Sequence, residues 1–89
     1  MRNLLAFDLG ASNGRAILGQ FDGEKITMRE LHRFENNYIE MNGVFYWDLP
    51  YLYNQLKQGF LAFKNANVGE LDCFGIDTWG VDYGLLDKN

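Results

Sequence analysis

The sequence predicts an α/β fold in which one helix packs against a largely apolar sheet. Two short apolar runs, at residues 4–7 and 71–76, are typical of buried strands, and each is followed by a carboxylate, Asp8 and Asp77. Between them, apolar residues recur at helical spacing over residues 49–63. The predicted order is strand, strand, strand, helix, strand, strand, which favours an α/β or α+β sheet covered by a helix.

The first three strands are expected at residues 3–9, 15–21 and 25–34. Asp22-Gly23 is a strong hairpin signal between the second and third strands. The third strand has no cleanly apolar face, which is typical of an edge strand. Residues 35–43 are expected to form an Asn-rich loop, and residues 44–47 a short extended piece.

The helix is expected to begin after Asp48 and to end near residues 65–67. Asp48 can accept a hydrogen bond from a free N–H, and Pro50 lies in the first turn, where its missing N–H costs nothing. One apolar stripe contains Leu49, Leu52, Tyr53, Leu56, Phe60 and Phe63. Gly59 inside this helix costs about 1 kcal/mol relative to alanine. We expect close approach of the helix to the sheet to compensate for it.

The last two strands are expected at residues 71–77, as a central strand, and at residues 81–86, with a loop at 78–80 between them. The helix covers one face of the predicted sheet, and nothing in the sequence covers the other. An exposed apolar face drives association. We therefore expect the chain either to self-associate or to pack against the remainder of a longer polypeptide.

Composition excludes several classes of partner. The 89 residues make one small domain or part of one, and their net charge of −4 disfavours nucleic acids and anionic membrane surfaces. No apolar run is long enough to span a bilayer, and the N-terminus lacks the apolar region of a signal peptide. The single cysteine, Cys73, cannot form an internal disulfide and is expected to be buried. These features favour a cytoplasmic protein.

A glycine-bracketed loop follows the first strand directly. Gly10 and Gly14 permit positive φ and close approach of another group, and the small residues between them leave N–H groups free for an anion such as phosphate. Asp8 stands beside this loop as a potential Mg²⁺ ligand. The same segment also fits an ordinary β-hairpin with glycine at its turn.

The sequence of residues 6–15, read together with residues 76–87, resembles the start of the FGGY carbohydrate kinases, and within that family most nearly the rhamnulokinases. Asp-Leu-Gly-Ala-Ser-x-Gly-Arg opens the chain and Gly-Ile-Asp-Thr-Trp-Gly-Val-Asp follows later; residues 29–34, Asn42-Gly43 and Trp47-Asp48 agree more weakly. Members have several hundred residues and two domains. The resemblance therefore implies that residues 1–89 are the N-terminal, incomplete part of the first domain, with a ribonuclease-H-like, actin-type fold.

The resemblance also implies the reaction and the residues that serve it. ATP would donate its γ-phosphoryl group to a ketose, converting L-rhamnulose to L-rhamnulose 1-phosphate, with L-fuculose and L-xylulose left open as substrates. Asp8 is implied on the Mg²⁺ side, and Trp79 and Gly80 at the sugar. The implied phosphate-binding residues are Gly10, Ala11, Ser12, Asn13, Gly14 and Arg15. The family's catalytic base lies beyond residue 89, so we expect the chain alone to be inactive.

Several alternatives stay open at this stage. Arg15 is equally well read as a surface arginine, and Trp79 as a core aromatic residue. Asp8 and Asp77 can cap turns through side-chain-to-backbone bonds. They can also serve as the metal carboxylates of a ribonuclease-H-like nuclease, which is the main rival function. The acidic charge and the Gly-rich loop weigh against that rival.

Overall fold

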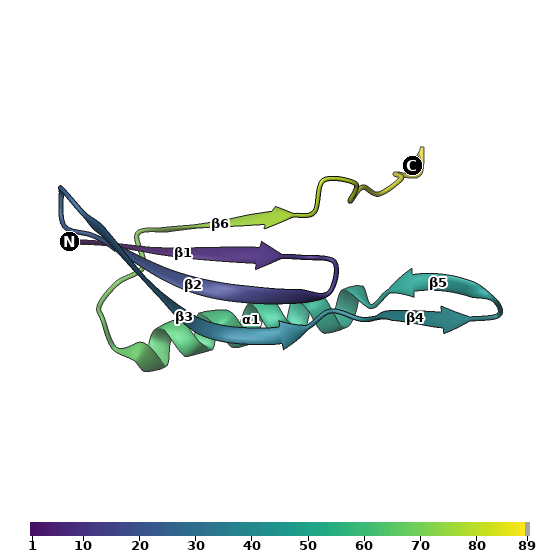
Figure 1. The fold of residues 1–89 in the computed structure, drawn as a ribbon, viewed down its shortest axis with the longest axis horizontal. Coiled ribbons are helices and arrows are strands. Elements are labelled where there is room, and N and C mark those ends of the chain that lie inside the picture. Colours follow the sequence, from purple (N-terminus) through teal and green to yellow (C-terminus); the bar gives the residue numbers. More distant parts are fainter. Residues whose placement is uncertain (89) are drawn as a thin grey trace.

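The fold is a four-stranded sheet with one helix on one face and a separate two-stranded hairpin beyond its end (Figure 1). The structure is a computed structural model that describes residues 1–88. The sheet has the strand order β3-β2-β1-β6, and the hairpin pairs β4 with β5. In chain order the elements are β1 (Arg2–Leu9), β2 (Asn13–Phe21), β3 (Ile26–Glu35), β4 (Tyr38–Met41), β5 (Val44–Trp47), α1 (Leu49–Ala66) and β6 (Cys73–Thr78).

The sheet combines an antiparallel meander with one parallel strand. β1 pairs antiparallel with β2, and β2 pairs antiparallel with β3, so the three strands form a meander. The chain then crosses over through α1, and β6 pairs parallel with β1 on the other side. This confirms the expected order of three meandering strands, a crossover helix and a parallel strand. The mixed α/β architecture is compatible with the ribonuclease-H-like fold of sugar kinases.

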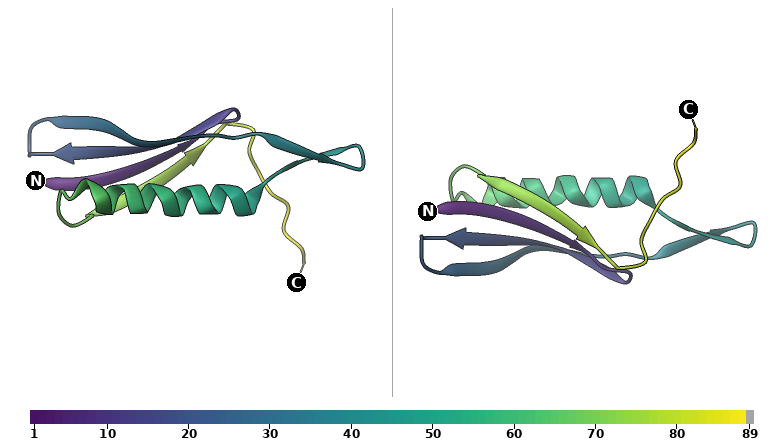
Figure 2. Two further views of the ribbon diagram at one scale, coloured as in Figure 1. Left: turned by 90° about the horizontal axis from the view of Figure 1, so that it is seen from below. Right: turned by 90° about the horizontal axis from the view of Figure 1, so that it is seen from above.

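The core lies between α1 and the inner face of β1, β2 and β3. Figure 2 shows α1 lying along one face of the sheet, with no helix or strand of residues 1–88 over the other face. Alternate residues of β1 and β2 point toward the helix and are almost completely buried. The main cluster comprises Leu5, Phe7, Ala16, Leu18 and Phe63. Each such large side chain contributes roughly 1.5–3 kcal/mol when fully buried.

Gly59 lets the helix approach this core closely. A Cβ at Gly59 would stand 3.0 Å from Cζ of Phe7 and 3.1 Å from Cβ of Ala16, and would overlap another atom of the Phe7 ring. A side chain at this position would push α1 away from β1 and β2. The expected compensation for glycine in this helix is confirmed.

Both helix ends match the expectation. The Asp48 carboxylate accepts a hydrogen bond from the Tyr51 N–H at 3.1 Å, and Pro50 stands in the first turn. At the other end Asn67 adopts the left-handed conformation with φ of 57° and stops the helix. Within the apolar stripe, Leu52 and Phe63 are buried, but Leu49 and Tyr53 are exposed.

The expected loop at residues 35–43 is wrong, because most of it forms β4 and its turn to β5. Asn42 and Gly43 both have positive φ, 52° and 77°. This is the pattern of a tight two-residue hairpin turn, for which Asn-Gly is the preferred sequence. The rings of Tyr38 and Phe45 pack edge to face across the hairpin, with centroids 4.8 Å apart.

The expectations for the C-terminal part need three corrections. Residues 81–86 form no strand, because no strand within residues 1–88 lies on the free side of β6 to pair with them. For the same reason β6, which begins at Cys73 rather than at residue 71, is an edge strand and not a central one. Cys73 is exposed, not buried. The apolar residues of β6 thus form a strand as predicted, although this strand is exposed.

Candidate functional site

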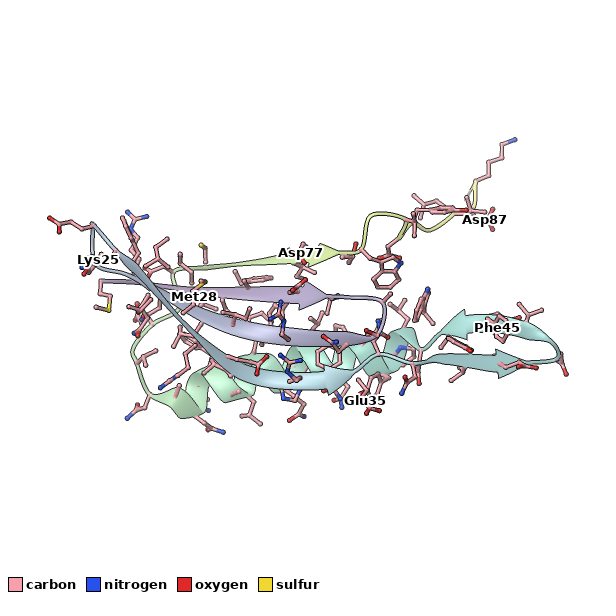
Figure 3. The ribbon with its side chains drawn as sticks, in the orientation of Figure 1. Lys25, Met28, Glu35, Phe45, Asp77 and Asp87 are labelled. Carbon is pink, nitrogen blue, oxygen red and sulfur yellow. The ribbon has the colours of Figure 1, made fainter. Side chains whose placement is uncertain are left out.

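The candidate site lies at the edge of the sheet where β1 and β6 both end. In the parallel register Asp8 stands opposite Asp77, and Leu9 stands opposite Thr78. Figure 3 labels Asp77 near the end of β6, beside the end of β1. The loop after β1 and the turn after β6 therefore leave the sheet side by side. Ligands of open α/β sheets commonly bind at the carboxyl ends of strands.

Two carboxylates and one arginine form a row across this edge. Arg15 on β2 stands opposite Asp8 and forms an ion pair with it, with Nη2 and Oδ2 2.5 Å apart. Asp77 flanks Asp8 on the other side. All three lie on the face away from α1, since Asp8 alternates with the buried Phe7 and Leu9.

The pKa values of the two carboxyl groups in this row are shifted in opposite directions. The hydrogen bond from Arg15, followed by one with Asp77, lowers the pKa of Asp8 below its ordinary value. Hydrogen bonding to Asp8, followed by desolvation and the charge of Asp8, raises the pKa of Asp77. The same ion pair raises the pKa of Arg15. Asp8 is thus the carboxylate held ionised, and Arg15 contacts Asp8 in this structure.

The loop after β1 is the tight link of a β-hairpin. The Gly10 N–H donates to the Asn13 carbonyl oxygen at 2.8 Å, and β2 begins at Asn13. Ala11, Ser12 and Asn13 are exposed. Within residues 1–88, the N–H groups of Ala11 and Ser12 donate to no protein atom. The hairpin geometry is compatible with both sequence interpretations, and it leaves N–H groups free at the loop.

Of the two reasons expected for these glycines, positive φ is wrong and close approach of another group is confirmed. Neither Gly10 nor Gly14 has a positive φ; the glycines that do are Gly23, Gly43 and Gly69. Space is the constraint instead, because a Cβ at Gly14 would overlap the Phe34 ring and one at Gly10 would stand 2.9 Å from the Asn13 oxygen. Gly14 is required by the packing of β3 against β2.

Asn36, just after β3, also holds this loop, and sequence reasoning missed it. Its backbone N–H donates to the Ser12 oxygen at 3.0 Å, and its Nδ2 donates to the Gly10 oxygen at 2.8 Å. It is one of the few buried polar side chains. An isolated asparagine after a strand carries no pattern that predicts this role, because its partners are distant in sequence.

The turn after β6 is held mainly by aromatic packing. Trp79 is half-buried and its ring lies against that of Trp47, with centroids 4.8 Å apart. Gly80 is exposed, and no protein atom lies within 4 Å of where its Cβ would be. The contact with Trp47 was missed from sequence. Trp79 therefore packs on a second exposed aromatic residue and lies outside the main core.

An open groove runs between this turn and the first half of α1. It has a volume of about 810 Å³ and is largely apolar. The lining includes Trp47, Trp79 and Asp82, together with Leu9, Leu49, Pro50, Leu52, Tyr53, Leu56, Thr78, Tyr83 and Gly84. Aromatic walls with a few polar groups are typical of small-molecule sites. The groove lies on the helix side of the sheet, and the carboxylate row lies on the other.

Two features, a metal-binding cluster and a membrane-spanning helix, are absent from the described residues. Residues 1–88 contain no group of three or more His, Cys, Asp or Glu side chains placed to hold a metal ion. No helix among these residues combines the length and the apolar character needed to cross a bilayer. Any metal site here would rest on the pair Asp8 and Asp77, with the other ligands supplied from elsewhere.

Comparison with known proteins tests the resemblance. No family model matches the chain. Curated relatives named rhamnulokinase do match. That of Mannheimia succiniciproducens is 47% identical over 98% of this chain, and that of Halalkalibacterium halodurans is 45% identical over 100% of this chain. The rhamnulokinase of Bacteroides thetaiotaomicron is 42% identical over 99%.

The chain spans only 18–19% of the length of these relatives. Each match nevertheless runs through the glycine loop, the row of charged residues and the turn after β6, because it covers nearly the whole chain. The nuclease alternative is not favoured by these findings. In sequence, the chain therefore matches a piece of a rhamnulokinase-like kinase, as the motifs of residues 6–15 and 76–87 predicted.

Proposed function

We propose that this chain supplies the nucleotide-phosphate loop and the sugar-contacting turn of an ATP-dependent ketose kinase. The proposed reaction converts L-rhamnulose to L-rhamnulose 1-phosphate. One observation carries the proposal: the loop after β1 and the turn after β6 leave the same edge of the sheet, in a chain that matches rhamnulokinases. We also propose that residues 1–89 form the N-terminal part of a first kinase domain with the actin-type fold. The cytoplasmic location stays a prediction.

On the nucleotide side, the hairpin loop offers hydrogen-bond donors to the β- and γ-phosphates of ATP. The free N–H groups of Ala11 and Ser12 and the exposed side chains of Ser12 and Asn13 are the proposed contacts. Gly10 and Gly14 keep the loop narrow. Arg15 is also a proposed phosphate contact, and it would have to share its guanidinium between Asp8 and the phosphate.

The charged row fits a magnesium ion that accompanies the nucleotide. Magnesium prefers carboxylate oxygens, keeps several waters and takes further ligands from phosphates, so two neighbouring carboxylates suffice on the protein side. Asp8, held ionised by Arg15, is the proposed ligand, and Asp77 is its neighbour. Bound Mg²⁺ would neutralise charge on the phosphates during transfer. No residue of the described chain is proposed as the catalytic base.

On the sugar side, Trp79 and Gly80 are the proposed contacts. An aromatic ring offers a flat surface for the C–H groups of a sugar, and Trp79 is held by Trp47 at the wall of the apolar groove. Gly80 has open space where a side chain would be, so its backbone is accessible to a hydroxylated ligand. The groove and the turn together provide both an apolar and a polar side for a small sugar.

A full-length enzyme tests the proposal. The test kinase is the Mannheimia rhamnulokinase in which this chain replaces the matching segment, which is 47% identical. We expect ADP release that depends on L-rhamnulose, with lower kcat/KM for L-fuculose and L-xylulose. The parent relative is the control for assembly. A folded test kinase without sugar-dependent ADP release would overturn the proposal, and preference for another ketose would overturn the substrate assignment.

The 89-residue chain alone is expected to show no turnover, because the proposed loop and turn include no catalytic base. A coupled ADP assay with ATP, Mg²⁺ and L-rhamnulose checks this. Sugar-dependent ADP release from the isolated chain would mean that a base within residues 1–89 has been overlooked.

A further inference from the structure

We infer that Asn36 is a positioning residue that aims the N–H groups of the loop after β1 toward the bound phosphates. The inference rests on the proposed function and adds to it a residue that no motif identified. Asn36 belongs to neither β1 nor β2, yet it makes two hydrogen bonds to the loop that joins them. Its side chain is 3% exposed, so water does not compete strongly for these bonds.

The two bonds hold two particular carbonyl groups. Nδ2 of Asn36 donates to the Gly10 oxygen at 2.8 Å, and the Asn36 N–H donates to the Ser12 oxygen at 3.0 Å. These carbonyls stand on either side of Ala11. The hairpin itself contributes the bond from the Gly10 N–H to the Asn13 oxygen. Asn36 therefore holds two carbonyl groups of the loop, those of Gly10 and Ser12.

Planarity of the peptide bond turns this contact into an orientation. In a trans peptide the carbonyl oxygen and the next N–H point in opposite directions within one rigid plane. Holding the Gly10 oxygen toward Asn36 therefore turns the Ala11 N–H away from it. Holding the Ser12 oxygen does the same for the Asn13 N–H. Of these two groups, the Ala11 N–H is a proposed phosphate contact, and it faces the side of the loop opposite Asn36, where the phosphates would bind.

Asn36 is itself fixed by the core. The preceding Phe34 is buried, and its ring packs edge to face on Tyr51 of α1. The Tyr51 hydroxyl donates to the Glu35 carbonyl oxygen at 2.9 Å. These contacts tie the end of β3 to the first turn of the helix. Asn36 is thus anchored to the helix by contacts that the loop does not make, as a positioning residue requires.

The substitution Asn36→Ala in the test kinase removes the side-chain bond and keeps the backbone bond. Asn37→Ala is the matched control, because Asn37 is exposed and its amide donates to the exposed Glu35 carboxylate, at 3.3 Å, and not to the loop. For Asn36→Ala we expect the KM and Kd for ATP to rise roughly 3- to 10-fold, the size of one lost hydrogen bond. The KM for L-rhamnulose and the Kd for adenosine, which has no phosphate, should stay within twofold.

Asn36→Asp keeps the shape of the side chain and replaces the donor by a carboxylate facing the Gly10 oxygen. We expect it to weaken ATP binding more than Asn36→Ala does, again without weakening adenosine binding. This variant carries the test if Asn36→Ala does not fold. Equal losses for ATP and adenosine, or ATP constants equal to those of Asn37→Ala, would overturn the inference. Failure of the unsubstituted test kinase to phosphorylate a ketose would instead overturn the proposed function.

Discussion

Strands β1 and β6 are neighbours of similar apolar character, yet only β1 is enclosed. Leu5 pairs with Phe74 and Phe7 pairs with Ile76 in the same rows of the sheet. Leu5 and Phe7 are 1% exposed, whereas Phe74 and Ile76 are 55% and 50% exposed. The helix packs on β1, β2 and β3 and reaches β6 through the edge-to-face contact between Phe60 and Phe74, which leaves Phe74 half-exposed. The comparison teaches that an apolar strand is buried only where another element lies over it.

The loops that follow the two strands differ in the same way. The loop after β1 is held by the hairpin register and by two hydrogen bonds from Asn36. The turn after β6 is held by the contact between Trp79 and Trp47 and by the bond from the Asp82 N–H to the Trp79 oxygen. The loop proposed to bind the nucleotide is thus held by the described residues themselves, and the turn proposed to contact the sugar depends more on what binds or packs against it.

The largest effect is expected from a substitution at Gly14, where the loop after β1 enters β2. Gly14→Val places a branched side chain where the Phe34 ring already lies, and such overpacking costs about 1–3 kcal/mol or more. We expect kcat/KM for ATP in the test kinase to fall at least tenfold, with a much smaller change in sugar affinity. Gly19→Ala on the same strand is the control, because its Cβ would meet only atoms at ordinary contact distance. Unchanged ATP affinity and turnover would contradict the phosphate-loop assignment.

The exposed apolar residues of β6 have a consequence for the isolated chain. We expect the isolated 89-residue chain to self-associate, because the half-exposed Phe74 and Ile76 continue into the exposed Val81, Tyr83 and Leu85. Sedimentation at increasing concentration measures this association. The double substitution Phe74→Thr and Ile76→Thr keeps the β propensity of the strand and should shift the distribution toward monomer. A stable monomer of the unsubstituted chain at high concentration is the result that rules the prediction out.

A smaller effect is expected at the exposed turn. Gly80→Ala meets no protein atom within 4 Å, so the substitution should leave the melting temperature unchanged. If the sugar lies against this backbone, its KM should rise about 3- to 10-fold in the test kinase while the ATP constants stay the same. Steady-state kinetics with each substrate varied in turn measure this. Equal losses for both substrates would show that the turn itself is disturbed.

The smallest effect is expected at Asp8 and Asp77, the neighbouring carboxylates near the ends of β1 and β6. The pKa of Asp77 is raised in the folded protein, so the stability tied to its proton is lost as pH rises through that raised value. Asp77→Asn should therefore increase the melting temperature of the test kinase by about 1–2 °C at neutral pH. This gain should vanish as pH falls below the ordinary carboxyl pKa of 3.8.

Asp8→Asn is the matched opposite of that substitution. The pKa of Asp8 is lowered, so its contribution is present above the ordinary value and is lost as pH falls through the lowered one. Its removal should reduce the melting temperature at neutral pH and matter less in acid. Melting curves across the acid range compare both variants. A decrease for Asp77→Asn at neutral pH would show that the pair is not repulsive.

Much of the fold was predictable because it rests on local signals. The apolar run of β1, the Asp22-Gly23 turn between β2 and β3, the cap at Asp48 and the close approach at Gly59 follow from neighbouring residues and helical spacing. Asn42-Gly43 is an equally local signal for a hairpin turn, although a loop was expected at residues 35–43. The strand expected at residues 81–86 did not form, because strands need partners that a local pattern does not specify.

By itself, the sequence determined the strands of the meander, the helix with its ends, and the two motifs that resemble those of rhamnulokinases. Only the tertiary structure decided that Gly14 is required by the Phe34 ring, that Trp47 supports Trp79 and that Asn36 holds the Gly10 carbonyl 26 residues away. The physical reason is range. Helical and strand periods arise between residues a few positions apart, whereas a loop is aimed by hydrogen bonds and packing from segments that meet only after folding.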